Sequence, residues 1–223
     1  IKSSAASDVY KRQCGNGIRC VGKFLYDHGM VDINEKDEIT IETLSGIKKL
    51  KAYTSGGKVN RLRVDMGKAI LEPKEIPVVL DGDKVVDRPV EIAGKNYNIT
   101  CVSMGNPHCV VFMDDIDNLD IETVGPEFEN DKLFPERVNT EFVTVLDDHT
   151  IKMRVWERGS GETWACGTGA CAVAVAACEN GFCKKGEDIK IKLKGGDLII
   201  NYTDETVYMT GNAEKVFEGE VEV

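Results

Sequence analysis

Two stretches of the chain have an apolar pattern that predicts a helix, and both stretches end in the same way. In the stretch from Gly17 to Tyr26 the apolar residues fall on one helix face, and Gly29 follows as a helix stop. In the second stretch an uninterrupted apolar run covers residues 170–178 and ends at Glu179-Asn180-Gly181. The pattern therefore predicts one amphipathic helix and one helix that is buried on all sides.

The rest of the chain shows short apolar segments separated by turn residues, which is typical of strands. Many short strands around two isolated helices predict an α+β fold in which a sheet wraps each helix. Ser55-Gly56-Gly57 is the preferred domain boundary. The expected strands cover residues 38–44, 47–52, 60–65, 78–80, 90–92, 97–104, 109–113, 141–146, 151–156, 189–193, 198–202, 207–210 and 218–223, with a further helix at 121–130.

The same short motif precedes both helices. Cys14-Gly15-Asn16-Gly17 and Cys166-Gly167-Thr168-Gly169 share the pattern C-G-[NT]-G, and each cysteine lies 15 residues before the glycine that closes its helix. Free N–H groups at a helix N-terminus lower the pKa of a nearby thiol and bind a carboxylate. The duplication predicts a site with two thiols.

The cysteines also admit other interpretations. A single cysteine near a helix start is usually a small buried apolar residue, and glycine-rich turns also bind phosphate. The C-x4-C pairs Cys166/Cys171 and Cys178/Cys183 suggest zinc, but two of these positions fall on the apolar helix, whereas zinc ligands usually sit on short turns. The duplicated spacing favours paired catalytic thiols, and no metal is expected.

Composition narrows the class of protein. The chain has 223 residues and a net charge of -10 with scattered lysine and arginine, which argues against nucleic acid or an anionic membrane as partner. No apolar run approaches the ~20 residues of a membrane helix. Eight cysteines without a visible signal peptide predict a reducing, cytoplasmic location rather than a disulfide scaffold.

Polar residues cluster before strands and turns. The segments are Asn106-Pro107-His108, residues 135–140, and residues 157–163 directly before the second cysteine motif. Individually they fit turn chemistry, a loop histidine or a surface ion pair. Two asparagines, an arginine, a glutamate and a histidine beside two thiols would instead suit a zwitterionic ligand.

These motifs, taken in order, resemble diaminopimelate epimerase. The resemblance covers Cys14 to the C-terminus and implies an isomerase that interconverts LL- and meso-diaminopimelate without pyridoxal phosphate or another cofactor, on the bacterial route to lysine and peptidoglycan. It also implies two pseudo-symmetric domains, each a mostly antiparallel curved sheet round a central helix, with the site between them. The matching motifs are Cys14-Gly15-Asn16-Gly17-x-Arg19-Cys20, Gly105-Asn106-Pro107-His108, Pro135-Glu136-Arg137-x-Asn139, Glu157-Arg158-Gly159-x-Gly161-Glu162-Thr163-x-Ala165-Cys166-Gly167-Thr168-Gly169 and Met209-Thr210-Gly211.

The resemblance assigns a role to each matching residue. Cys14 and Cys166 become the two bases, one acting as thiolate and the other as thiol on the opposite face of the α-carbon. His108 and Glu157 assist at the reacting amino group. The substrate-binding positions are Gly15, Asn16, Asn106, Asn139, Arg158, Gly167 and Thr168, of which the glycines, Asn16 and Thr168 hold the reacting carboxylate through their backbone.

The chain departs from the family at its front. The family has an asparagine ligand nine residues before the first cysteine, where this chain has Ala5, and another near its own N-terminus. Residues 1–13 are therefore expected to be a foreign leader on a fragment. With a C-terminal strand that returns to the first domain, the expected domains are residues 1–57 plus 212–223, and residues 58–211.

Three questions stay open from sequence. A proline or hydroxyproline racemase shares the logic of two cysteines, although Asn106, Asn139 and Arg158 favour a substrate with a distal carboxylate. A cysteine-rich metal or redox protein is the non-enzymatic alternative. Whether the chain forms a homodimer is not determined by the sequence.

Overall fold

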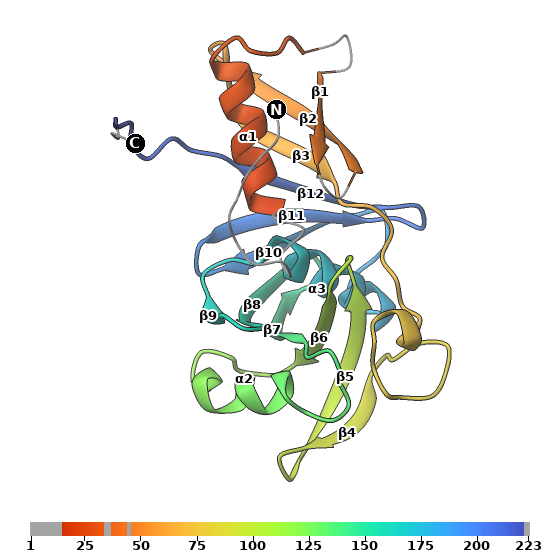
Figure 1. Ribbon diagram of the computed structural model, residues 1–223. Coiled ribbons are helices and arrows are strands. Elements are labelled where there is room, and N and C mark those ends of the chain that lie inside the picture. Colours follow the sequence, from red (N-terminus) through yellow and green to blue (C-terminus); the bar gives the residue numbers. More distant parts are fainter. Residues whose placement is uncertain (1–14, 34–36, 44–45, 221–223) are drawn as a thin grey trace. The chain divides into compact units, whose positions relative to one another are not determined.

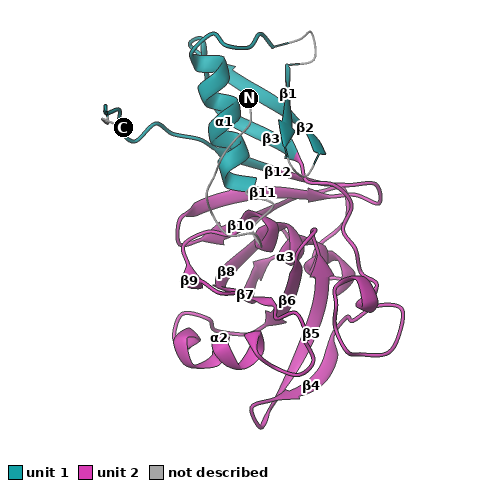
Figure 2. Ribbon diagram, in the orientation of Figure 1, with its two compact units in different colours: residues 1–64, 210–223 teal, residues 65–209 magenta. Residues whose placement is uncertain are grey.

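The structure is a computed structural model that describes residues 15–33, 37–43 and 46–220 (Figure 1). The chain divides into two compact units (Figure 2). Unit 1 comprises residues 1–64 and 210–223, and unit 2 comprises residues 65–209. The domain boundaries expected from sequence stay a prediction.

Unit 1 packs one helix against an antiparallel meander. Helix α1 (Gly15–Asp27) is followed by β1 (Glu38–Thr43), β2 (Gly46–Ser55) and β3 (Lys58–Asp65). A Cβ atom on Gly22 would lie 2.8 Å from Leu62 Cδ2 and 2.9 Å from Leu50 Cδ2. The helix can approach the strands this closely only because Gly22 has no side chain.

The glycine pair proposed as a domain boundary is a hairpin turn. Gly56 and Gly57 both have positive φ, 60° and 76°, and they join the paired residues Ser55 and Lys58 of β2 and β3. Such a two-residue turn requires left-handed backbone at both positions, which glycine adopts without strain. Residues 58–64 consequently group with unit 1.

Unit 2 is a larger, mostly antiparallel sheet around a buried helix. Its strands run in the order β11-β10-β8-β7-β6-β5-β4, with β9 paired to β8; β6–β7 and β8–β10 are parallel. The elements are η1 (Pro73–Glu75), β4 (Arg88–Ile92), β5 (Lys95–Ser103), β6 (Pro107–Phe112), α2 (Ile121–Glu129), β7 (Asn139–Asp147), β8 (Thr150–Glu157), β9 (Gly161–Thr163), α3 (Gly167–Glu179), β10 (Asp188–Leu193), β11 (Gly196–Tyr202) and β12 (Val207–Asn212), whose last residues belong to unit 1.

Helix α3 is the centre of unit 2. Residues 167–177 are all buried, and the helix contacts strands from both halves of the sheet, β5, β6 and β7 on one side and β10 and β11 on the other. A helix covered on all sides has no need of a polar face, which explains the uninterrupted apolar run. The prediction of an α+β fold dominated by a curved sheet is confirmed.

Helices α1 and α3 end with the same type of cap. Gly29 and Gly181 have φ of 65° and 78°, and the following residues, Met30 and Phe182, donate their N–H groups to the carbonyls of Leu25 (2.8 Å) and Ala177 (2.9 Å). This six-to-one bond beside a left-handed glycine is the Schellman arrangement. The helix stops expected from the sequence are thus confirmed.

Two expected strands are wrong within the described residues. Residues 78–80 form no strand, because the N–H groups of Val78 and Val79 bond the carbonyls of Pro73 and Leu133. Residues 218–220 form no strand either, and residues 221–223 lie outside the described part of the chain. Strand β9 was not expected, since three residues carry too little pattern to be recognised.

Across the described residues, none of the helices has both the length and the apolar character needed to traverse a bilayer.

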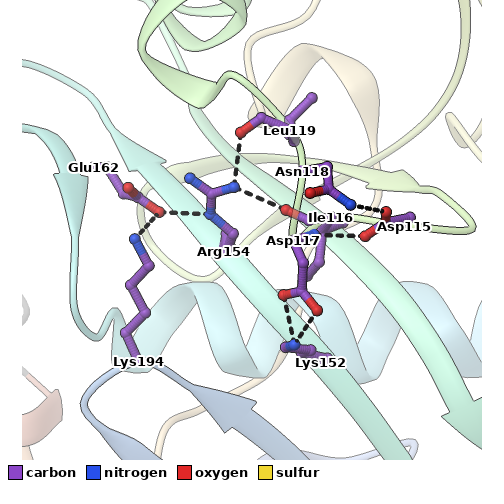
Figure 3. A network of polar contacts seen from close by, with 9 residues as sticks. All are labelled: Asp115, Ile116, Asp117, Asn118, Leu119, Lys152, Arg154, Glu162 and Lys194. Atoms are coloured by element: carbon purple, nitrogen blue, oxygen red, sulfur yellow. Dashed lines mark hydrogen bonds and ion pairs between the residues drawn. The ribbon is translucent and has the colours of Figure 1, made fainter.

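Strand β9 is fixed by a network of charged side chains (Figure 3). Glu162 accepts a hydrogen bond from Arg154 Nε and pairs with Lys194 Nζ, each at 2.7 Å. Arg154 also donates to the carbonyls of Ile116 and Leu119, both at 2.8 Å. Burial raises the pKa of Glu162, but the hydrogen bonds from Arg154 and Lys194 outweigh burial and hold this pKa below its ordinary value.

We expect Glu162→Gln to lower the Tm at pH 7 by roughly 2–6 °C, because it removes charge-assisted bonds worth about 1–2 kcal/mol. A depressed pKa in the folded state contributes stability above the unfolded value of about 4.3 and loses it as the pH falls through the folded value. The Tm difference from the parent should therefore shrink at pH 3. Asp117→Asn is the matched control, because Asp117 pairs with Lys152 in the same network but its side chain is 63% exposed. An equal effect of both substitutions would contradict the assignment.

Candidate active site

The polar residues of unit 2 that were expected to form the site come together at one end of three central strands, β6, β7 and β8. Parallel pairing sets His108 of β6 opposite Asn139 of β7, and antiparallel pairing sets Thr140 of β7 opposite Trp156 of β8. The first residues of β7 therefore lie beside the last residues of β8. This register explains why segments around 106, 139 and 157 meet.

Asn139 ties these strands together. Its side-chain amide donates to the carbonyl of Pro107 (2.8 Å), and its Oδ1 accepts from the N–H of Arg158 (3.0 Å). The side chain is nearly buried, at 5% exposure. Asn139 thus fixes where Arg158 leaves β8, and one of its amide hydrogens is not accounted for by these two bonds.

Cys166 caps helix α3. Its backbone is extended (φ -124°, ψ 111°), and its sulfur accepts a hydrogen bond from the N–H of Gly169 at 3.4 Å. The Thr168 hydroxyl lies 3.5 Å from the same sulfur. The thiol therefore sits at the positive end of the helix, beside the first-turn N–H groups, as the sequence motif predicts.

A hydrogen-bond chain leads from the sheet to this thiol. His108 is fully buried; its Nδ1 lies 2.7 Å from Glu141 Oε1, and its Nε2 lies 3.1 Å from Asn106 Oδ1. Asn106 then donates from Nδ2 to Thr168 Oγ1 at 3.3 Å. Together with the Thr168–Cys166 contact, these bonds connect Glu141 to the sulfur without a gap.

The electrostatics of the thiol differ from the expectation. Burial raises the pKa of Cys166, and the carboxylates of Glu157 and Glu141 raise it further; the bonds from Thr168 and Gly169 lower it only partly. The helix N-terminus alone was expected to lower this pKa. Burial and the nearby Glu157 and Glu141 outweigh that effect and raise the pKa of Cys166 instead.

A second carboxylate supports the loop that follows β8. Glu129, the last residue of α2, accepts from Trp156 Nε1 (2.8 Å), the N–H of Gly159 (2.9 Å) and Arg137 (3.2 Å). Gly125 of α2 lies against the Trp156 ring so closely that a Cβ there would be 2.3 Å from Cδ2. These contacts set the position of the turn that carries Glu157 and Arg158.

Glu157 and Arg158 differ in their contacts. Glu157 Oε1 accepts from the Thr163 hydroxyl at 2.6 Å, across the short β8–β9 pair. The guanidinium of Arg158 donates to the carbonyl of Glu136 at 2.7 Å and is partly exposed. The guanidinium of Arg158 has five N–H donors and keeps further hydrogen-bonding capacity for a ligand.

The first cysteine motif belongs to unit 1. Gly15 and Asn16 begin α1, where Arg19 donates to the Gly15 carbonyl (3.2 Å) and to Asn16 Oδ1 (3.1 Å). Arg19 Nε also donates to the carbonyl of Asn212 at 3.3 Å. Cys14 lies outside the described residues. Within unit 2 the structure brings together Asn106, His108, Asn139, Glu157, Arg158, Cys166, Gly167 and Thr168.

Sequence reasoning missed two residues. Glu141 and Glu129 are both nearly or fully buried carboxylates that bond side chains or backbone of the site. A signal for Glu141 was present, since an ionisable residue stood at the start of the expected apolar strand 141–146. Buried carboxylates are rare unless they are paired, so such a residue is a candidate for a role in a site.

Comparison with solved structures defines the class of fold. The chain superposes on a probable proline racemase from Agrobacterium radiobacter K84, solved with bound carbonate, with a TM-score of 0.68 and 17% identity. The match covers 90% of this chain and 65% of that chain, so the present chain spans just under two thirds of that protein. At this identity the likeness concerns the fold alone.

Comparison with curated sequences is more specific. The chain is 51% identical over 219 residues to a diaminopimelate epimerase from Agathobacter rectalis and 52% identical over 212 residues to one from Acetivibrio thermocellus. It covers 75% and 74% of these relatives, which cover 94% of it. The family model for diaminopimelate epimerase matches residues 100–216. The chain therefore belongs to the diaminopimelate epimerase family, a family of isomerases.

Proposed function

We propose that this chain interconverts LL-2,6-diaminopimelate and meso-diaminopimelate by proton transfer between two thiols, without a cofactor, in the cytoplasmic synthesis of lysine and peptidoglycan precursors. The observation that carries the proposal is Cys166, a buried thiol that caps helix α3 within a set of polar side chains. The identity of half or more to curated diaminopimelate epimerases supports the choice of substrate.

Inversion at a carbon atom needs a base on one face and an acid on the other. In one direction the Cys166 thiolate removes the α-proton and becomes a thiol, while the Cys14 thiol delivers its own proton to the opposite face and becomes a thiolate. In the other direction the roles exchange, and one proton enters for each that leaves. A thiolate whose pKa has been raised is also a stronger base toward a weakly acidic α-proton.

Negative charge spreads onto the substrate carboxylate as the α-proton leaves. The backbone N–H groups of the C-G-[NT]-G motifs, at Gly15, Asn16, Gly167 and Thr168, bind this carboxylate in the proposal, because a helix N-terminus presents unpaired donors and positive potential. Those donors gain most from the charge that develops during the reaction. They therefore favour the transition state over the bound substrate.

The remaining residues hold the two ends of the substrate. His108 and Glu157 assist at the reacting amino group, as the family resemblance implies. Asn106, Asn139 and Arg158 bind the substrate, and the planar guanidinium of Arg158 suits the distal carboxylate. This division explains how one site could distinguish diaminopimelate from amino acids that share only its reacting end.

The test is epimerisation of LL-diaminopimelate by the full-length protein, without added pyridoxal phosphate. Formation of the meso isomer is followed by chiral chromatography, with L-lysine and L-proline as competing substrates. We expect kcat/KM for diaminopimelate to exceed that for lysine by at least about 10³-fold, because the site would leave donors unpaired when the distal carboxylate is missing. Comparable racemisation of L-proline would support the racemase alternative and reject this substrate.

A further inference from the structure

We propose that Glu141 is a positioning residue that sets the direction of the hydrogen-bond chain ending at Cys166, so that the Thr168 hydroxyl donates its proton to the sulfur. The inference extends the proposed function, in which Cys166 is one of the two bases. It rests on four consecutive contacts, Glu141–His108 (2.7 Å), His108–Asn106 (3.1 Å), Asn106–Thr168 (3.3 Å) and Thr168–Cys166 (3.5 Å).

The hydrogen-bond chain has a direction, because a hydroxyl group and a neutral imidazole ring each have only one hydrogen to donate. Asn106 presents Oδ1 to His108 and Nδ2 to Thr168, so His108 must donate from Nε2 and Thr168 must accept at Oγ1. The single proton of the Thr168 hydroxyl is then free to point at the sulfur. A neutral His108 that donates from Nε2 has an unprotonated Nδ1, which needs a donor. Glu141 supplies that donor if its carboxyl group carries a proton.

The burial of Glu141 supports this protonation. The side chain is 0% exposed, and among the described residues its Oε2 has no hydrogen-bond partner. An ionised carboxylate with one unpaired oxygen in a dry interior is far more costly than a neutral acid. Helix α3 also packs closely against the Glu141 carboxyl group, since a Cβ on Gly169 would lie 2.6 Å from Oε1. Burial raises the pKa of Glu141, and the contact with His108 opposes that rise only in part.

The same chain can run in the opposite direction. In this second arrangement the side-chain amide of Asn106 is turned over. The Cys166 thiol then donates to Thr168, and the Thr168 hydroxyl donates to Asn106 Oδ1. Asn106 Nδ2 donates to His108 Nε2, and His108 donates from Nδ1 to an ionised Glu141. The two arrangements carry the same net charge. They differ in one proton, which resides on Glu141 when Cys166 is a thiolate and on Cys166 when Glu141 is a carboxylate. The hydrogen-bond chain therefore links the protonation of Cys166 to the protonation of Glu141, four contacts away.

Other titratable groups surround this chain and act in both arrangements. Glu157 of β8 faces both Cys166 and Glu141, and Cys109 of β6, paired with Cys101 of β5, lies beside Glu141. All are present in every variant below. Of these groups, Glu157 raises the pKa of Cys166.

The experiment measures Cys166 itself rather than turnover. The full-length protein is treated with iodoacetamide between pH 6 and 10, and alkylation of the Cys166 peptide is timed by mass spectrometry. Glu141→Gln retains a neutral donor toward His108 Nδ1, so its rate profile should stay within about threefold of the parent. Glu141→Leu removes that donor, and Thr168→Val removes the hydroxyl from the sulfur. Each should slow alkylation at pH 8 by about tenfold, as the loss of a bond to a charged group predicts.

The double variant distinguishes a directed hydrogen-bond chain from an effect of side-chain packing alone. In the Thr168→Val background, Glu141→Leu should cause no further slowing, because the connection to the sulfur is already cut. Alkylation of exposed Cys20 and the thermal unfolding curve serve as controls for reactivity and folding. Equal profiles for Glu141→Gln and Glu141→Leu, or additive slowing in the double variant, would overturn the proposal. The readout needs no substrate, so it is independent of whether diaminopimelate is the substrate.

Discussion

Replacement of Cys166 by alanine is expected to lower kcat/KM for LL-diaminopimelate by at least about 10³-fold, since a positioned acid or base contributes up to about 10⁴-fold. Loss of one thiol removes the acid in one direction and the base in the other, so both directions should fail. Cys14→Ala should have the same effect if Cys14 is the second base. The measurement is the rate of conversion of each pure isomer, in the full-length protein.

A partial reaction separates loss of chemistry from loss of the fold. With Cys166 absent, the remaining thiol can still exchange the α-hydrogen of one stereoisomer with solvent deuterium, because exchange on one face needs only one group. Cys20→Ala is the control, as Cys20 is an exposed thiol. Epimerisation near the parent rate in either Cys14→Ala or Cys166→Ala would reject the mechanism with two bases. Loss of activity in Cys20→Ala would show that the assay reports damage to the fold.

Replacement of Arg158 by methionine is expected to reduce kcat/KM for diaminopimelate by about 10³-fold, because a site built to pair with a distal carboxylate loses both binding and alignment without its cation. Alignment matters since the α-carbon must lie between two thiols. The main-chain N–H of Arg158 would still donate to Asn139, so the local backbone should persist. Racemisation of L-lysine, which has no distal carboxylate, should change much less.

Arg88→Met is the matched control for this substitution. Arg88 donates to the carbonyl of Asp81 as Arg158 donates to that of Glu136, and both guanidinium groups are exposed at these bonds. The rate of Cys166 alkylation tests whether the thiol is intact in each variant. Unchanged kinetics in Arg158→Met would remove this residue from the site. An equal loss in Arg88→Met would indicate an effect of charge in general.

Local chemistry explains which features could be predicted from the sequence. The two helices were evident because their apolar spacing and their closing glycines are properties of neighbouring residues, and Gly29 and Gly181 have the left-handed backbone that a helix stop requires. The polar residues of the site were also predictable, because the turns that precede strands are rich in polar residues that can be recognised in the sequence. Gly56-Gly57 shows the limit: the pair correctly marked a turn, but only pairing of β2 with β3 reveals that this turn closes a hairpin.

By itself the sequence determined the class of fold, the glycines that close α1 and α3, and the residues that gather near Cys166. The tertiary structure decided which of those residues contact one another, how deeply they are buried and which charges surround them. Register between β6, β7 and β8 brought His108, Asn139 and Glu157 together, and the close approach of Gly169 to β7 set the buried carboxyl of Glu141 against the helix start. The direction of the Cys166 pKa shift followed from burial and from carboxylates distant in sequence. Desolvation and long-range pairing depend on the whole packed unit, so neither can be deduced from a local motif.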